Sequence, residues 1–273
     1  DLRGNELTVA SGGSTFKLAG GELEAFPEVS FASDGDIVLD ARELAKSISS
    51  VRYAAAAEEF RAIFRGVQLE LADQRSRVVA TDGFRLAYRD FAGAGAGSRK
   101  LVIPARNADE LVRVLRDGEA RLAATPGALS VHCGNTRLNA KLMDGELPDY
   151  ERVIPKTSQV RVTLAADTLR ESVARVAVVA DKLTSNRVDF IVSGGRLQLV
   201  AESDYGRAQD VLEVLQDGSE PGTTIGFRAK QLLDALGPMS GEVTIELGAS
   251  GAPAVFRCTG DPDYLAIVVS LRV

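Results

Sequence analysis

The stretch GELPDYERV at positions 145–153 repeats, at an offset of 124 residues, the stretch GELEAFPEV at positions 21–29. A second repeat relates LVIPAR at 101–106 to TIGFRA at 224–229. Each of these segments is followed by a Gly-Glu pair, and the two pairs are 123 residues apart. Repeats of this length are whole domains, because solenoid units run only about 20 to 50 residues. We therefore expect similar domains in tandem, which can build a pseudo-symmetric arc or ring.

The repeat divides the chain into two full domains and a shorter first segment. Residues 1–34 correspond to the last quarter of a domain, residues 35–157 form the middle domain and residues 158–273 form the third. On this arithmetic about 90 residues of a first domain are expected to precede Asp1. Alternating apolar residues predict strands, and apolar residues at helical spacing predict two helices in each full domain. The expected fold class is α+β, with two helices on an antiparallel sheet in each domain.

Local signals place several of these elements. Asp82-Gly83 lies between two alternating segments and predicts a tight hairpin turn. Asp167 is a plausible N-cap for the third helix, and the last strand is expected over residues 264–272. The four expected helices cover residues 40–53, 105–116, 166–182 and 227–236.

Composition and motifs give no indication of catalysis. Apolar residues make up 45% of the chain, but the longest apolar runs are far shorter than the ~20 residues of a membrane span, so no membrane partner is expected. No Cys or His spacing resembles a metal site, and His132 reads as an ordinary strand residue. The glycines at 93, 95 and 97 precede a strand rather than a helix, unlike a phosphate loop. We expect no cofactor, no metal and no catalytic residue.

The two cysteines indicate a reducing compartment. Cys133 and Cys258 fall in equivalent strands of different domains, and equivalent positions of neighbouring domains rarely meet. A disulfide between them is therefore not expected. Two reduced thiols suit the cytosol.

Charge is distributed unevenly. The four expected helices hold eleven basic and eight acidic residues, whereas the whole chain has a formal net charge of −6. One interpretation is the ordinary mixed charge of helix surfaces. The other is a weakly basic helical face on an acidic body, which would hold a polyanion through its long-range field without reading sequence.

Three segments resemble one known family. VATDGFRLA at 79–87 resembles the A-T-D-G-H-R-L-A signature of bacterial DNA polymerase III β subunits, the sliding clamps. LMDGELPDYERVIP at 142–155 resembles their D-G-x-x-P-D-Y-x-R-V-x-P segment, and DYLAIVVSLRV at 263–273 resembles their tail Y-L-x-x-x-M-P-x-R-L. The resemblance covers the whole chain, from the end of the first clamp domain through the second and third.

This resemblance implies a DNA clamp fold and a non-catalytic processivity factor in the bacterial cytoplasm, at the nucleoid. Two chains of three domains join head to tail, encircle duplex DNA with their helices and tether the replicative polymerase. The first domain forms the homodimer contact, so a chain without it is expected to dimerise weakly or not at all. The residues expected to face DNA are Arg42, Lys46, Arg52, Arg106, Arg113, Arg170, Arg175, Lys182, Arg228 and Lys230.

The resemblance also implies a hydrophobic groove between the middle and third domains. It would take short Q-L-x-L-F-like peptides that polymerases, the clamp loader and repair proteins share. Phe84 stands where the family commonly has His, and Ser270 where it has Pro, and both bear on peptide preference. Carried over by motif, the walls are Arg61, Phe64, Thr81, Gly83, Phe84, Arg85, Leu86, Pro148, Arg152, Val153, Val268, Val269, Ser270, Leu271 and Arg272.

Two alternatives remain open at this point. An enzyme on a duplicated α+β scaffold would need a pocket with convergent titratable groups. A protein-interaction scaffold that does not bind DNA would lack a net positive face on its concave side.

Overall fold

The computed structural model describes residues 2–25, 31, 35–57, 61–93, 95, 97–181, 185–219, 224–249 and 251–271. The chain forms two units, Asp1–Ala32 and Ser33–Val273. The first unit is a three-stranded antiparallel sheet, followed by the short 3₁₀ turn η1 (Leu23–Ala25). Its strands, in spatial order, are β1 (Leu2–Arg3), β2 (Glu6–Ser11) and β3 (Ser14–Ala19).

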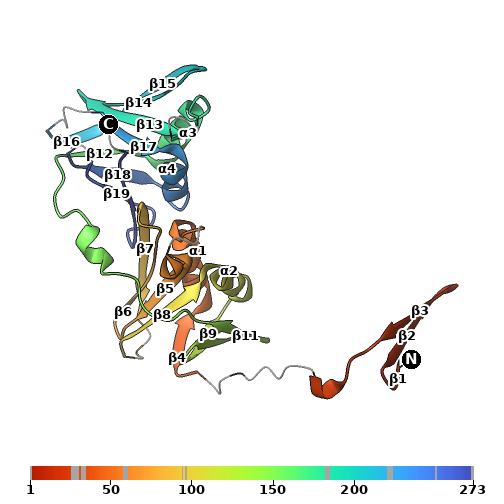
Figure 1. Ribbon diagram of the computed structural model, residues 1–273. Coiled ribbons are helices and arrows are strands. Elements are labelled where there is room, and N and C mark those ends of the chain that lie inside the picture. Colours follow the sequence, from red (N-terminus) through yellow and green to blue (C-terminus); the bar gives the residue numbers. More distant parts are fainter. Residues whose placement is uncertain are drawn as a thin grey trace. The chain divides into compact units, whose positions relative to one another are not determined.

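The second unit is built around a nine-stranded antiparallel sheet with the order β16-β12-β18-β19-β20-β7-β6-β5-β8 (Figure 1). The middle domain contributes β5 (Gly66–Leu71), β6 (Arg75–Thr81), β7 (Arg85–Ala92) and β8 (Arg99–Pro104). The third contributes β12 (Val160–Ala165), β16 (Leu215–Gly218), β18 (Glu242–Leu247), β19 (Ala254–Cys258) and β20 (Tyr264–Val268).

Each of these two domains adds a four-stranded antiparallel sheet of its own. In the middle domain the spatial order is β11-β10-β9-β4, and in the third it is β15-β14-β13-β17. The middle strands are β4 (Ile37–Asp40), β9 (Glu119–Thr125), β10 (Ala128–Cys133) and β11 (Thr136–Lys141). The third-domain strands are β13 (Arg187–Ser193), β14 (Arg196–Ser203), β15 (Gly206–Glu213) and β17 (Ile225–Arg228).

The nine-stranded sheet is continuous because β7 of the middle domain pairs with β20 of the third. In this ladder Leu86 lies opposite Ile267 and Tyr88 lies opposite Leu265. We call this ladder the seam. It joins the middle and third domains within the compact unit Ser33–Val273.

Four α-helices lie to one side of the nine-stranded sheet (Figure 1). The first begins after Asp40, whose carboxylate accepts a hydrogen bond from the Glu43 amide at 2.8 Å and so satisfies a backbone donor of the first turn. Its apolar face, with Leu44 and Ile48, is fully buried. The expected α+β fold is therefore confirmed. The helices are α1 (Ala41–Val51), α2 (Ala105–Val114), α3 (Ala166–Val176) and α4 (Ala229–Leu236).

Three expectations need correction. The third helix ends at Val176, where i→i+3 hydrogen bonds tighten the chain into turns; residue 182 lies outside the described residues. Asp167 is not its N-cap: Ala165 holds that position, and Asp167 pairs with Arg170 one turn later. The last strand ends at Val268, and beyond it the amide of Leu271 turns away and donates to the Gly226 carbonyl at 2.7 Å.

Apolar residues on both faces of the seam are buried. Seam residues on the helix side, such as Ala87 and Ala266, pack in the main hydrophobic core. Because successive strand residues point to opposite faces, a second cluster forms on the face away from the helices. It contains Phe64, Val79, Leu86, Leu147, Tyr150, Val255, Leu265 and Ile267. No helix among the described residues is both long and apolar enough to span a membrane.

Candidate functional site

The turn between β6 and β7 presents an aromatic side chain at the edge of the seam. One carboxylate oxygen of Asp82 accepts hydrogen bonds from the amides of Phe84 at 2.8 Å and Arg85 at 3.0 Å. Gly83 has a φ of +88°, a conformation that costs a glycine little. The Thr81 hydroxyl donates to the Arg85 carbonyl at 2.7 Å. The turn is thus rigidly specified, and it leaves the Phe84 side chain 55% exposed.

The third domain holds this turn in place. The amide of Val269 donates to the Phe84 carbonyl at 2.9 Å, just beyond the end of β20. The guanidinium of Arg85 pairs with Asp82 at 3.0 Å and with Asp234 of α4. A loop of the middle domain is therefore fixed by contacts to both domains.

The segment that carries the repeated GELPDYERV sequence forms the facing wall. The amide of Leu147 donates to the Gln68 side chain at 2.7 Å, and the Tyr150 hydroxyl donates to Glu70 at 3.0 Å. Arg77 donates to the same hydroxyl at 3.4 Å. Burial raises the pKa of Tyr150, so its hydroxyl stays protonated as a donor. These bonds hold the 3₁₀ turn η4 (Tyr150–Val153) against the sheet.

Two adjoining cavities, which share Phe64 and Arg85, form a groove at the seam. The first has a volume of about 230 Å³ and mostly apolar walls, and the second about 490 Å³ with more polar ones. The first is lined by Phe64, Thr81, Gly83, Arg85, Leu86, Pro148, Asp149, Tyr150, Val153, Pro253 and Val269. The second is lined by Ala56, Ala57, Arg61, Phe64, Asp82, Phe84, Arg85, Arg228 and Gln231.

Ten of the fifteen residues expected in the groove line these cavities: Arg61, Phe64, Thr81, Gly83, Phe84, Arg85, Leu86, Pro148, Val153 and Val269. The other described ones do not. Val268 and Ser270 are buried, Leu271 bridges to β17, and Arg152 is largely exposed and paired with Asp149. Arg272 lies outside the described residues.

Sequence reasoning missed several lining residues. Tyr150 and Asp149 belong to the segment used for the resemblance, so that motif could have indicated them. Pro253 and Arg228 come from the third domain and carry no local signal of a groove. The remaining missed residues are Ala56, Ala57, Asp82 and Gln231.

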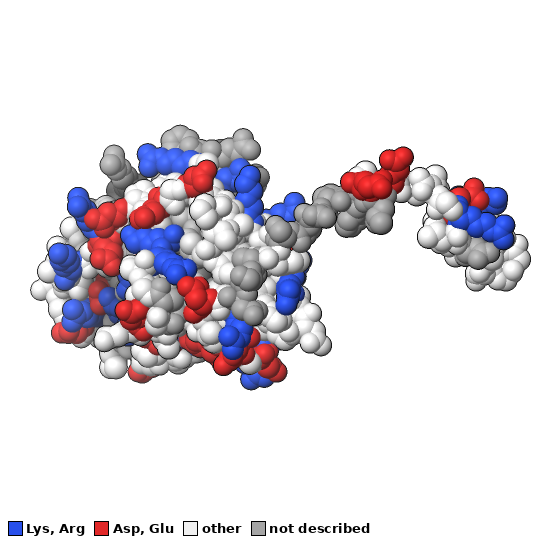
Figure 2. Space-filling model, turned by 90° about the horizontal axis from the view of Figure 1, so that it is seen from below, with Lys and Arg blue, Asp and Glu red and all other residues white. Residues whose placement is uncertain are grey.

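Most basic residues expected to face DNA are already paired with carboxylates. The pairs are Arg42–Asp117, Lys46–Asp261, Arg52–Asp109, Arg113–Glu110, Arg170–Asp167, Arg175–Asp210 and Lys230–Asp234. Arg106 is exposed and has no ion-pair partner among the described residues, Arg228 lies beside the groove, and Lys182 is outside the described chain. Basic and acidic side chains also intermix on the face shown in Figure 2. The basic character of the helices is therefore locally neutralised.

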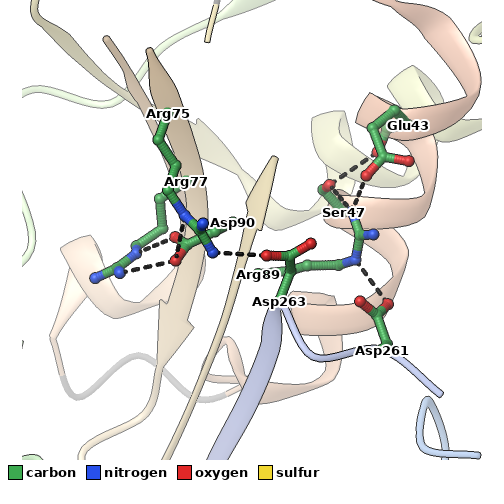
Figure 3. Close-up of polar contacts among 8 residues, drawn as sticks. All are labelled: Glu43, Ser47, Arg75, Arg77, Arg89, Asp90, Asp261 and Asp263. Carbon is green, nitrogen blue, oxygen red and sulfur yellow. Dashed lines mark hydrogen bonds and ion pairs between the residues drawn. The ribbon is translucent and has the colours of Figure 1, made fainter. Parts of the chain in front are cut away.

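A buried ion network joins the two domains beneath the seam (Figure 3). Arg89 of β7 donates to Asp261 of the third domain at 2.8 Å and to Ser47 of α1 at 2.7 Å, and it pairs with Glu43. Burial alone would raise the pKa of Asp261, but hydrogen bonds from Arg89 and Lys46 outweigh it and lower that pKa. The network keeps Asp261 ionised and ties the domains together.

A neighbouring network extends the connection. Arg75 and Arg77 both pair with Asp90, at 3.0 and 2.6 Å, and Arg75 also pairs with Asp263 of the third domain at 2.6 Å (Figure 3). The guanidinium of Arg77 lies over the Tyr88 ring, with 3.9 Å between its central carbon and the ring centroid. No cluster of three or more potential metal ligands occurs in the part of the chain that the structure describes.

Family models match both full domains. Residues 38–149 match the DNA polymerase III beta subunit central domain, and residues 151–272 match its C-terminal domain. The chain belongs to the DNA polymerase III beta subunit family. It is similar to the beta sliding clamp of Salmonella typhimurium, with 30% identity over 100% of this chain and 75% of that protein. The clamp of Caulobacter vibrioides is 32% identical over 98% of this chain and 74% of its own length.

Solved beta subunits share the architecture. The Thermotoga maritima structure has a TM-score of 0.89 and 29% identity, and a Pseudomonas aeruginosa structure has 0.91 and 27%. Each covers 100% of this chain, which spans 75% and 76% of theirs. The fold is thus the DNA clamp fold, and the chain is a sliding clamp, a non-catalytic processivity factor of DNA polymerase III.

Proposed function

We propose that the groove at the seam is the site where this sliding clamp receives peptides of its partners. The observation that carries the proposal is the pair of adjoining cavities between the β6–β7 turn, η4 and the segment after β20. Q-L-x-L-F-like segments of polymerases, the clamp loader and repair proteins are the proposed ligands. A similar structure, 26% identical, is a Pseudomonas aeruginosa sliding clamp bound to griselimycin.

The apolar cavity suits the Leu and Phe of such a peptide. Phe64 and Leu86 form a packed floor, and the 57% exposed Val153 offers an apolar wall. Each ligand side chain would gain about 1.5–3 kcal/mol if fully buried. Gly83 has no side chain, so a peptide can approach the backbone of the turn closely.

We further propose that the helices face duplex DNA inside a homodimeric ring, in the bacterial cytoplasm at the nucleoid. The pairing of most helix cations supports a sliding contact. Ion pairs between exposed side chains are weak, so a cation such as Arg42 can exchange its carboxylate for a phosphate at little cost. Phosphate contacts of this kind carry no sequence information, which allows movement along the duplex.

Calorimetry with a Q-L-x-L-F peptide tests the groove. We expect micromolar binding to the chain and none of a scrambled peptide. Val153→Asp should weaken binding by about tenfold or more, because a charge replaces an apolar wall. Val211→Asp is the matched control, since Val211 is 50% exposed and lines neither cavity. Failure of a folded sample to bind, or equal effects of the two substitutions, would contradict the proposal.

A further inference from the structure

Basic side chains cluster on the four-stranded sheet of the middle domain. In its ladder His132 of β10 lies opposite Arg121 of β9 on one side and opposite Arg137 of β11 on the other. Side chains directly opposite each other in an antiparallel pair have Cβ atoms about 4.5–5.5 Å apart. Lys141 lies four residues beyond Arg137 on β11, so it points to the same face. We call Arg121, His132, Arg137 and Lys141 the basic patch.

The basic patch lies on the sheet face that is turned away from the helices. Leu122 and Val131, which alternate with patch residues along β9 and β10, are buried in the main core together with Leu44 of α1. The patch residues point the opposite way and are exposed, except for the partly buried His132. The patch is therefore separate from the helix surfaces, and none of its residues lines the groove at the seam.

The positive charge of the patch is incompletely compensated. Among the described residues, no carboxylate pairs with Arg137 or Lys141. Arg121 pairs with Glu119 at 3.1 Å, but the two side chains are 48% and 66% exposed, so this pair is weak. Asp40, the other carboxylate of the four strands, lies opposite Glu119 on β4, at the edge of the sheet farthest from β11. Positive charge therefore predominates over β10 and β11.

The internal repeat shows that the fold does not require these cations. The third domain holds the equivalent strands β18, β19 and β20, and there the corresponding row consists of Thr244, Arg257 and Leu265. Its single cation, Arg257, pairs with Glu246 at 3.5 Å. In the middle domain two arginines flank one imidazole instead, and their mutual repulsion does not serve the stability of the sheet. This arrangement favours an anionic ligand.

The surroundings of the patch suit a phosphate backbone. Asn139 lies between Arg137 and Lys141 on the same face of β11, and its side-chain amide can donate to a phosphate oxygen. The four strands contain no Phe, Tyr or Trp on which a base could stack, and Val38 is the largest apolar residue on this face. A protein partner would lack the apolar centre that interfaces use.

The spacing of the cations also matches a duplex. Four residues of an antiparallel strand separate Arg137 from Lys141 by about 14 Å. A duplex carries one phosphate for about each 3.4 Å of each strand, so this length faces several phosphates. Cations spread over such a length can contact the backbone without reading the bases.

We propose that the basic patch binds the phosphate backbone of duplex nucleic acid, on the face of the middle domain opposite the helices. This inference goes beyond the proposed function, in which the helices face the duplex that the ring encircles. The patch would engage a segment of duplex outside the ring, through contacts that weaken as the salt concentration rises.

Lysine acetylation followed by mass spectrometry tests this contact, because lysines lie on both faces. Lys141 reports on the patch, whereas Lys46 and Lys230, with side chains 54% and 80% exposed, report on the helices. The folded chain is acetylated at low salt alone, with a short duplex, with a single strand of the same length, or with polyglutamate. We expect the duplex to protect Lys141 most strongly, and high salt to abolish this protection.

A matched pair of variants assigns the protection to the patch. In Arg137→Gln the duplex concentration that half-protects Lys141 should rise about threefold, because one exposed cation is lost. Arg257→Gln changes the equivalent row of the third domain, and there the protection of Lys141 should be unchanged. Both side chains are exposed, so both variants should give the circular dichroism spectrum of the folded chain.

The outcomes separate this inference from the proposed contact of the helices. Protection of Lys46 and Lys230 without Lys141 would overturn the inference and leave the helix contact intact. Protection of Lys141 alone would support the patch and contradict the helix contact. Equal protection of Lys141 by polyglutamate, or equal effects of the two substitutions, would refute the assignment of a phosphate backbone to the patch.

Discussion

Replacing Arg89 by Met should strongly destabilise the junction of the middle and third domains. The Arg89 side chain is 4% exposed and that of Asp261 is 8% exposed, and their ion pair measures 2.8 Å. Arg89 also lies opposite Tyr264 in the seam ladder. Met approximates the aliphatic part of arginine, so the substitution removes the charge and its hydrogen bonds while keeping most of the packing.

The size of the destabilisation depends on which partners Glu43 and Asp261 keep once Arg89 is replaced. Glu43, with a side chain 38% exposed, can regain water, but Asp261 cannot. Among the described residues, the ion-pair partner that Asp261 then keeps is Lys46, at 2.9 Å, whose side chain is 54% exposed. Removing one partner of a buried ion pair costs about 3–5 kcal/mol, and the remaining lysine places the expected loss near the lower limit, about 3 kcal/mol. That is a large share of a total stability of about 5–15 kcal/mol.

Urea unfolding followed by circular dichroism measures the effect. Arg99→Met is the control, because its ion pair with Asp36 is exposed and should contribute less than about 1 kcal/mol. The double variant Arg89→Met/Asp261→Asn should recover part of the loss, since no buried carboxylate is left without its arginine. A loss below about 1 kcal/mol in the single variant, or no recovery in the double one, would refute this account of the seam.

Two further predictions concern stability. The pKa of Asp261 is lower in the folded chain than in the unfolded chain. The contribution of its carboxylate to the free energy of unfolding is therefore complete above the unfolded pKa of about 3.9, and it is lost as pH falls through the folded pKa. The urea midpoint should therefore fall more steeply on acidification below about pH 5 in the unmodified chain than in Asp261→Asn; parallel curves would contradict this. The Ser270 hydroxyl is buried and has no hydrogen-bond partner among the described residues, so Ser270→Ala should stabilise the chain by about 1 kcal/mol in thermal melts. A lower melting temperature would instead indicate a partner for this hydroxyl.

Elements with local signals could be predicted from the sequence. The spacing of Leu44 and Ile48 indicated α1, and Asp82-Gly83 indicated the β6–β7 turn, because helix periodicity and turn chemistry act over a few residues. The same motifs supplied most of the middle-domain wall of the groove. Helix ends were less accurate: α3 ends at Val176 because tighter turns replace its last expected turns, which periodicity alone does not show.

Features that join distant segments could not be predicted. The pairing of β7 with β20 has no local signature, because the sequence of each strand shows only an ordinary alternating or apolar pattern. Arg89 and Asp261 are separated by 172 residues. The charge count treated Lys46 as available to DNA, whereas the fold pairs it with the same aspartate. Arg228 was assigned to the helix face for a similar reason, and only the tertiary structure places it over Phe84.

The position of the groove on the seam bears on how it would bind a short peptide under the proposed function. The walls come from both domains, and their relative placement is set by the β7–β20 ladder, the Val269–Phe84 hydrogen bond and the buried Arg89 network. Under the proposed function a peptide would meet walls that are already formed, and most of the ordering cost of binding would fall on the peptide. The same residues that make two repeated domains one unit thus also shape the site, which a single repeat could not form alone.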